Sequence, residues 1–456
     1  SVLSRSRDNW ITNGHTGQKS LGNYDENAGR LQLLWTPNDR FSALLSHQSR
    51  SLDGTSSIFR ANIFTTGSRE LNQNYDRELV YYDGGDNNPQ SYNSQGTTLN
   101  LTWDFDNATF NSITSVQQAE GSSRGDIDGG VANIGSFPTP PDGITFADID
   151  IFGIPSRTWP GPIFTPSVTE DGADTDQFTQ EFRLASTGDG RFNWQIGAFY
   201  FDSDLVVTTD SFASYGFVDV QDTKIEQKNT AWAVFGQSSF DVTDIINLTA
   251  GVRHTNDQKD FKVLQFGQLW LDLGIPTFIA DPIDVDDGQL SWDIAANIAM
   301  GDDASFYARM ANGFRAQTIQ GRDVAFLETP SVAEPETIES YEIGVKADML
   351  DNRLRFNLAW FNYTVEDMQL SIIGGASNTN QVVNARKGVA TGFEFDAQWL
   401  LTDNLLVSYG TSYNDTTIRD ANLSTAPCGS GICTVLDPVN PNNPAQVLVD
   451  GNPFPR

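Results

Sequence analysis

The composition of this 456-residue chain excludes several classes of protein. It lacks the roughly 18 consecutive apolar residues that a transmembrane helix requires. Its net charge of −31 and the absence of a Lys/Arg run argue against a nucleic-acid-binding protein, which needs a basic face. A hydrophobic content of 38% is normal for a soluble protein. A transmembrane β-barrel has a similar composition, because its strands are apolar only at alternate positions.

About fifteen antiparallel strands are predicted, beginning with a partial strand at Ser1–Arg7. The next fourteen form seven hairpins with short turns rich in Asp, Asn and Gly, which tolerate left-handed backbone angles. In chain order the hairpins are Gly29–Trp35 with Phe41–His47, Thr97–Trp103 with Ala108–Val116, Phe178–Ser186 with Phe192–Phe201, Thr230–Phe240 with Ile246–His254, Gln289–Ala299 with Ala304–Asn312, two strands within Glu336–Tyr363, and Ala390–Trp399 with Leu405–Tyr413.

Long links separate these hairpins. They are Arg50–Gly96, Gln117–Gln177, Asp202–Asn229, Thr255–Gly288, Gly313–Thr337, Val365–Val389 and Asn414–Arg456. The alternation of short turns and long links is typical of an outer-membrane barrel, which has short periplasmic turns and long extracellular loops. A soluble β-sandwich has no reason to keep this asymmetry.

The hairpin within Glu336–Tyr363 indicates how the two faces differ. Apolar side chains alternate with polar ones along both strands. The apolar set, expected to face lipid, is Tyr341, Ile343, Val345, Ala347, Leu354, Phe356, Leu358 and Trp360. The polar set, expected to face a wet lumen, is Ser340, Glu342, Gly344, Lys346, Arg353, Arg355 and Asn357. Trp35, Trp103, Trp194 and Trp399 lie beside short turns, as in an interfacial aromatic girdle.

Several motifs resemble those of the TonB-dependent outer-membrane receptors. They are Tyr307–Arg315, Pro335–Thr337 followed by Ser340–Lys346, and Val382–Ala385 followed by Gly392–Phe395; Arg30–Asn38 and Gly54–Gly67 resemble sphingomonad-type versions. The resemblance runs through nearly the whole chain. It implies that residues 1–456 are the β-barrel portion of such a receptor, with about 15 of about 22 strands and without the plug domain or the last strands.

The resemblance also implies a function and a location. A family member would import a scarce nutrient, such as a siderophore-bound iron, a vitamin or a carbohydrate, across the outer membrane of a Gram-negative bacterium. It would be energised by the TonB–ExbB–ExbD complex through the plug, would contact lipid and lipopolysaccharide, and would need no cofactor. Two alternatives stay open: a passive porin, which usually folds a charged constriction loop inward, and a soluble secreted β protein.

Candidate site residues are few. Arg309, Asn312 and Arg315 lie where a strand enters a long loop and could hold an anionic ligand; alternatively, this stretch shapes the loop exit and Arg315 meets lipopolysaccharide phosphate or a loop acid. Cys428 and Cys433 are expected to form a disulfide in an oxidising compartment, with free thiols or a metal as alternatives. Scattered histidines and the lack of catalytic motifs argue against an enzyme.

Overall fold

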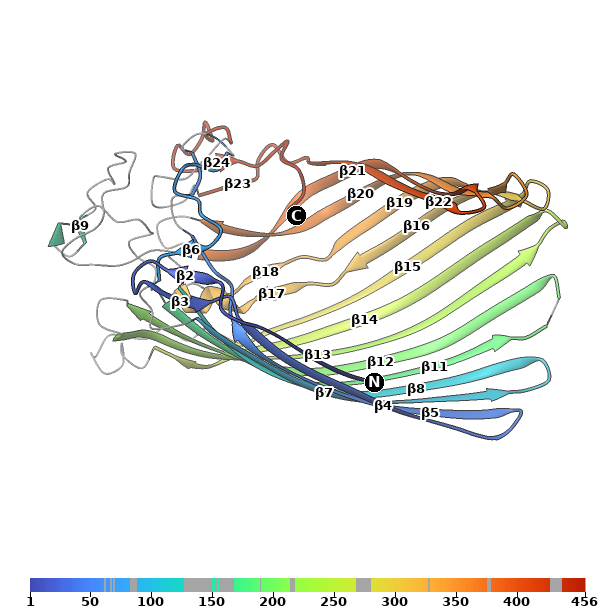
Figure 1. Cartoon of the computed structure of the whole chain (residues 1–456), viewed down its shortest axis with the longest axis horizontal. Helices are drawn as coiled ribbons and strands as arrows, with labels where there is room; N and C mark the ends of the chain where they lie inside the picture. The colour runs from blue at the N-terminus through green and yellow to red at the C-terminus, as the bar shows by residue number, and fades with distance from the viewer. Residues whose placement is uncertain are drawn as a thin grey trace.

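One antiparallel sheet of fifteen strands dominates the computed structural model (Figure 1). The structure describes residues 1–60, 63–65, 68, 70–82, 88–126, 150–151, 154–155, 168–188, 190–213, 218–267, 280–326, 329–374, 379–426 and 437–455. The strands, in their order across the sheet, are β1 (Val2–Arg7), β4 (Tyr24–Asn38), β5 (Phe41–Thr55), β7 (Pro89–Asp104), β8 (Ala108–Asp126), β11 (Val168–Ser186), β12 (Phe192–Ala213), β13 (Val218–Asp241), β14 (Ile246–Phe266), β15 (Ile283–Ala299), β16 (Ala304–Arg315), β19 (Glu336–Met349), β20 (Leu354–Gly374), β21 (Thr379–Thr402) and β22 (Leu405–Ile418).

All seven predicted hairpins are present, and their short turns gather at one end of the sheet (Figure 1). In the turn between β19 and β20, Leu350, Asp351 and Asn352 have φ angles of 57°, 55° and 61°. Asp and Asn adopt this left-handed region more readily than other non-glycine residues, which explains a tight turn here. The register places Ile343 opposite Trp360 and Lys346 opposite Asn357, so the predicted apolar and polar sets do occupy opposite faces.

Three of the predicted long links are mostly strand; in the one predicted over Thr255–Gly288, β14 continues to Phe266 and β15 begins at Ile283. The prediction of a link over Asp202–Asn229 is wrong, because β12 continues to Ala213 and β13 begins at Val218. The link predicted over Val365–Val389 is likewise short, because β20 ends at Gly374 and β21 begins at Thr379. With 24 residues, β13 is far longer than the roughly 9–11 residues that cross a bilayer, so the strands continue beyond the membrane-crossing part.

The link between β16 and β19 folds onto one face of the sheet. Residues 316–326 and 329–335, here called the inward segment, contain β17 (Thr318–Gln320), a 3-10 helix η1 (Gly321–Phe326) and β18 (Ser331–Ala333). The helix η1 contacts β13 and β14 and also β21, which lies several strands further along the sheet. The sheet is therefore curved around this segment, and the face that it contacts is the inner face.

Amphipathicity inverts along the strands. Near the short turns, exposed apolar side chains such as Phe192, Ile196 and Tyr200 of β12 occupy the outer face. Further along, the outer positions become charged, and Asp204 pairs with Lys228 at 2.9 Å. The inner positions there become apolar, and Phe261, Phe266, Ile319 and Val324 form a core with Ile225, Val263, Ile283 and Val285. The apolar outer band of β12 is about as long as a bilayer-crossing strand.

Aromatic side chains border this band at the short turns. The rings of Trp35, Phe41, Trp103 and Phe105 form a continuous row with centroid separations of 5.7, 5.7 and 5.9 Å. Trp399 is also exposed, whereas Trp194 is half-buried. The row on β4, β5 and β7 agrees with the predicted girdle, because indole and phenyl rings favour the boundary between hydrocarbon and water.

Smaller sheets lie at the end of the long links (Figure 1). They are β2 (Ile11–Asn13) with β3 (Gln18–Leu21) and β6 (Leu79–Val80), β9 (Asp150–Ile151) with β10 (Ile154–Pro155), and β23 (Ser424–Thr425) with β24 (Val447–Leu448). The first is held by a core of Ile11, Leu21 and Val80. No helix within the described ranges has the length and apolar content to cross a membrane.

Candidate ligand-binding site

A cavity of about 530 Å³ lies between the inward segment and the inner face of the sheet. Its apolar wall comes from Leu205, Val207, Ile225, Phe261 and Ile319. Its polar wall includes Gln90, Tyr92, Ser123, Thr209, Thr223, Gln227 and Gln320. Within its described lining, Asp171 and Arg322 are the only charged residues. A concave, partly apolar space with a few convergent polar groups is suited to a small molecule.

The two charged residues of the cavity form an ion pair. A guanidinium nitrogen of Arg322 in η1 lies 3.5 Å from Asp171 Oδ2 on β11. The hydroxyl of Thr209 donates to Asp171 Oδ1 at 2.8 Å, which fixes the carboxylate from the wall side. The pair attaches the inward segment to β11, several strands away from β16 and β19, between which the segment lies in the chain. About a third of each side chain stays exposed. It can therefore contact a ligand as well as hold the segment.

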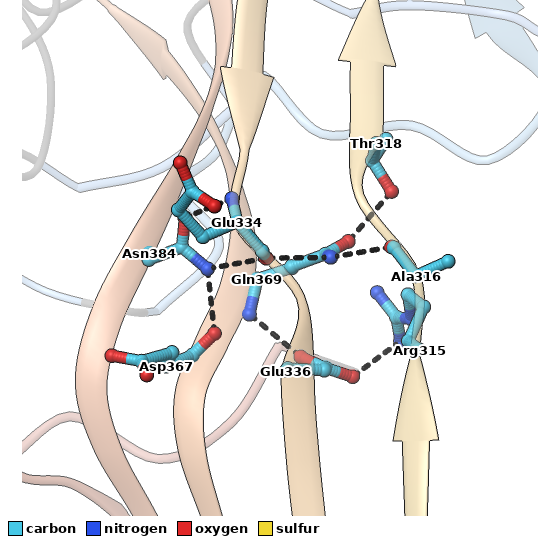
Figure 2. A network of polar contacts seen from close by, with 8 residues as sticks. All are labelled: Arg315, Ala316, Thr318, Glu334, Glu336, Asp367, Gln369 and Asn384. Atoms are coloured by element: carbon cyan, nitrogen blue, oxygen red, sulfur yellow. Dashed lines mark hydrogen bonds and ion pairs between the residues drawn. The ribbon is translucent and has the colours of Figure 1, made fainter. Parts of the chain in front are cut away.

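A polar network centred on Gln369 of β20 holds the two ends of the inward segment, here called its stems (Figure 2). Its carboxamide nitrogen donates to the carbonyl oxygens of Ala316 and Glu334 at 2.9 and 3.0 Å. Its carboxamide oxygen accepts from Thr318 Oγ1 at 2.6 Å, and its backbone nitrogen donates to Glu336 Oε2 at 2.6 Å. Gln369 is only 7% exposed, so these groups are satisfied away from bulk water.

Asn384 of β21 extends this network. Its carboxamide nitrogen donates to the carbonyl oxygens of Glu334 and Asp367 at 2.9 and 2.6 Å, and its carboxamide oxygen accepts from the Glu334 nitrogen at 2.8 Å (Figure 2). Asp367 has a φ of 52°, in the left-handed region that Asp tolerates better than most residues. Asn384 thus links the C-terminal stem of the inward segment to two neighbouring strands.

The middle of the inward segment is held separately. Asp323 in η1 is fully buried, and its Oδ2 accepts hydrogen bonds from the Ser331 nitrogen at 2.7 Å and the Ser331 hydroxyl at 2.5 Å. The Ser331 hydroxyl in turn accepts from the Val382 nitrogen of β21 at 2.9 Å. Because both stems and the middle are bonded to the wall, the segment is a fixed part of the cavity.

The three predicted ligand residues do not form one site. Arg309 and Asn312 both line a second depression of about 320 Å³ on the wall, near Asp293 and Arg253. Arg309 Nε is 3.9 Å from Asp293 Oδ2, and Asn312 Nδ2 donates to the Ile338 carbonyl at 3.3 Å. Arg315 lies outside this depression and pairs with Glu336 Oε1 at 3.2 Å, as part of the Gln369 network.

Sequence reasoning missed the cavity, although it had a partial signal for the network. Arg315, Glu336 and Asn384 each belong to one of the motifs that indicated the family, and the fold brings these motifs together (Figure 2). Gln369 and the cavity lining, which comes from strands and from η1, carry no motif. Cys428 and Cys433 lie outside the described residues, so their pairing stays a prediction.

The sheet and its faces define a class of protein. A meander of antiparallel strands with an apolar outer band, aromatic residues at the short turns and a partly apolar, ligand-sized cavity inside is the wall of an outer-membrane β-barrel. The family model for "TonB dependent receptor-like, beta-barrel" matches residues 6–447. The chain belongs to this family, whose members are receptors of the Gram-negative outer membrane, and it is an outer-membrane protein.

Individual relatives agree with this assignment. The pesticin receptor of Yersinia pestis is 26% identical over 225 residues, which are 49% of this chain and 31% of that protein. A probable TonB-dependent siderophore receptor, PiuA of Acinetobacter baumannii, is 30% identical over 123 residues, or 27% of this chain and 14% of that protein. The chain thus spans less than a third of the length of these curated relatives.

Solved structures share the fold. The ferric yersiniabactin uptake receptor FyuA from Yersinia pestis has a TM-score of 0.67 at 18% identity, covering 91% of this chain and 56% of that one. The siderophore receptor PiuA from Acinetobacter baumannii has a TM-score of 0.67 at 14% identity, covering 100% of this chain and 62% of that one. At these identities the similarity establishes the fold alone.

Proposed function

We propose that the whole protein is a TonB-dependent transporter that imports a small, scarce nutrient across the outer membrane. The observation that carries this proposal is the family match over residues 6–447. The cavity of about 530 Å³ supports it, because it lies on the inner face at the end of the long links, where a ligand arriving from outside the cell would first be held. The role is non-catalytic.

A ferric siderophore is the first candidate for the ligand. Its support is the printed names of the relatives, among them a probable siderophore receptor and a ferric yersiniabactin uptake receptor. A vitamin or a carbohydrate would fit the mixed polar and apolar lining of the cavity as well. Arg309 and Asn312, which line the second depression, and Arg315, which lies outside it, remain proposed ligand contacts.

The proposed partners follow from the family. A plug domain carrying a TonB box would fill the lumen of the full-length protein and connect it to TonB–ExbB–ExbD. The apolar outer band would contact membrane lipid, and the charged outer positions beyond it would contact lipopolysaccharide. No nucleic-acid partner is proposed, in keeping with the net charge of −31.

A passive porin is the second candidate, because the inward segment narrows the lumen as a constriction loop does. Its contacts with the wall are a core of Ile319 and Val324 and the network around Gln369, which bonds mainly backbone carbonyls and includes one Arg315–Glu336 ion pair. A porin constriction uses opposed rows of charged residues. Among the described contacts of the inward segment, Arg322 and Asp171 form a single ion pair and no such rows are seen. The transporter is therefore preferred.

Growth of a deletion strain tests the proposal. The strain lacking the full-length gene is grown on limiting amounts of candidate nutrients, with ferric siderophores first, and is complemented with the intact gene. The proposal expects one nutrient to support growth only when the gene is present. Equal growth with and without the gene on every ferric siderophore, vitamin and carbohydrate tested would count against it.

A further inference from the structure

Three polar side chains lie within the apolar outer band, on the strands β8 and β11. Thr114 of β8 is directly opposite Gln180 of β11, and Gln180 is directly opposite Tyr200 of β12, so all three side chains share the outer face. Ser112, two residues from Thr114 on the same strand, points the same way. Ser112, Thr114 and Gln180, here called the outer polar cluster, therefore face the membrane.

Apolar side chains border this cluster on both sides along the strands. Toward the short turns Phe110 is opposite Leu184, and toward the long links Val116 is opposite Phe178. Val116 and Phe178 are 50% and 37% exposed on the outer face. The first charged outer residue of β11, Asp176, comes only beyond them. The outer polar cluster thus lies in the middle of the apolar band, where no water is available to it.

The hydrogen bonds inside the cluster do not use all of its polar groups. Thr114 Oγ1 donates to Gln180 Oε1 at 2.6 Å, and Gln180 Nε2 donates to Ser112 Oγ at 3.1 Å. Gln180 Nε2 also donates to the Glu181 carbonyl at 3.2 Å, so both hydrogens of the carboxamide are used. Within the part of the chain that the structure describes, the Ser112 hydroxyl proton has no acceptor, and Gln180 Oε1 keeps a second lone pair.

A remaining donor and acceptor are unfavourable in hydrocarbon, because acyl chains offer no hydrogen-bond partner. The neighbouring strand β12 avoids this cost, since Ile196 and Ala198 occupy the corresponding outer positions opposite Leu184 and Phe182. Hydroxyl and carboxamide side chains in a membrane commonly form hydrogen bonds to another membrane-spanning segment. The outer polar cluster therefore indicates a contact with a protein surface rather than with lipid alone.

A second copy of the same chain has the complementary groups at the required depth. Two copies in one membrane are related by a two-fold axis along the membrane normal, so equivalent residues lie at the same depth. The Ser112 hydroxyl of one copy can then donate to Gln180 Oε1 of the other copy, and the symmetry repeats this bond in reverse. Phe178 and Phe182, 37% and 46% exposed on either side of Gln180, would pack around the two bonds.

We propose that the outer polar cluster is a self-association surface, through which two copies of the full-length protein form a two-fold dimer in the outer membrane. Two reciprocal hydrogen bonds between Ser112 and Gln180 lie at its centre, and the apolar side chains around them exclude lipid. The cavity lies on the inner face, so each copy keeps its own ligand site. This inference goes beyond the proposed function and does not depend on it.

Association of the purified full-length protein in lipid vesicles tests this surface. Samples labelled with a fluorescence donor and a fluorescence acceptor are reconstituted together at a series of protein-to-lipid ratios, and energy transfer gives the dimer affinity. Ser112→Ala removes both reciprocal bonds and should weaken association about tenfold, the loss expected for two hydrogen bonds between membrane-spanning segments. Gln180→Leu should weaken it at least as much, whereas Ser112→Thr, which keeps the hydroxyl, should associate nearly as the wild type does.

Thr411→Ala is the matched control. Thr411 is an outer-face hydroxyl of β22, opposite Phe395 and many strands away from β8 and β11. This variant should associate as the wild type does, and equal resistance of all variants to urea in the vesicles shows that each is folded. A wild type that stays monomeric at every ratio would overturn the surface. Equal association by the wild type, Ser112→Ala and Gln180→Leu would overturn it as well.

Discussion

At the scale of single residues, the candidate site depends on neutral amides more than on charges. Gln369 bonds the two stems of the inward segment, and Asn384 bonds its C-terminal stem to Asp367 (Figure 2). Backbone groups buried without a partner are destabilising, so a carboxamide that satisfies several of them fixes a loop strongly. A segment fixed in this way keeps the cavity open to a constant size rather than acting as a mobile gate.

Replacing Gln369 should release the segment. Gln369→Leu keeps the side-chain volume but removes its bonds to Ala316, Thr318 and Glu334, at about 1–3 kcal/mol for each buried group left unpaired. Hydrogen exchange at β17 and β18 should become at least tenfold faster. Gln32→Leu is the control, because Gln32 makes one exposed bond to Ser46. Unchanged exchange in Gln369→Leu would show that the apolar core holds the segment alone.

Glu26 should contribute stability with a defined pH dependence. Arg5 and Arg50 lower its pKa in the folded state below 4.5, so the stabilising effect is fully present above 4.5 and is lost as the pH falls through the folded-state pKa. Urea unfolding of wild type and Glu26→Gln, from about pH 7 to about pH 3, measures this. The difference in midpoint should be constant above 4.5 and shrink below it. A difference that grows on acidification would contradict this assignment.

At the scale of elements, the long strands β12, β13 and β14 have two zones with opposite amphipathicity. The zone near the short turns has its apolar side chains outside, where lipid replaces water. The zone near the long links has its apolar side chains inside, where the inward segment covers them. The change between zones accounts for strands that are twice the length needed to cross a bilayer, such as β12 and β13.

A charge introduced near the short turns should therefore destabilise the protein in the membrane only when it lies on the outer face. Ile294 of β15 is 54% exposed on the outer face, and Asn297, three residues away, lies on the inner face. Ile294→Lys should destabilise the membrane-inserted state by about 2–4 kcal/mol, and Asn297→Lys should be tolerated. Urea titration in lipid vesicles and heat-dependent gel migration report both effects. Equal tolerance of the two substitutions would mean that the faces are assigned the wrong way round.

The hairpins were predictable because their information is local. Alternation over ten residues and a short polar turn determine a hairpin without reference to the rest of the chain, as for Glu336–Tyr363. The strand extensions over Asp202–Ala213 and Val365–Gly374 were not predictable, because the polar residues on their outer faces are equally typical of loops. The contacts of Arg5 and Arg50 with Glu26, and of Arg50 with Tyr92, could not be predicted for another reason. Arg5, Arg50 and Tyr92 are far apart in sequence and meet only through strand register.

At the scale of the whole molecule, the curved sheet and the inward segment act together. The segment crosses the inner face from its stems at β16 and β19 to β13 and β14, and the Arg322–Asp171 pair attaches it to β11 (Figure 1). The cavity is therefore built both from strands of the sheet and from the inward segment. This arrangement suits a receptor that captures a small ligand at the outer end of a barrel.

The most direct test of the central claim is energised uptake by the full-length protein. Uptake of a radiolabelled ferric chelate is measured in cells that carry the protein, with and without TonB and with and without the proton gradient. A TonB-dependent receptor should accumulate the chelate only when TonB and the gradient are both present, while surface binding persists without them. Uptake that is equally fast without TonB, and that rises linearly with chelate concentration, would contradict the claim and indicate a passive pore.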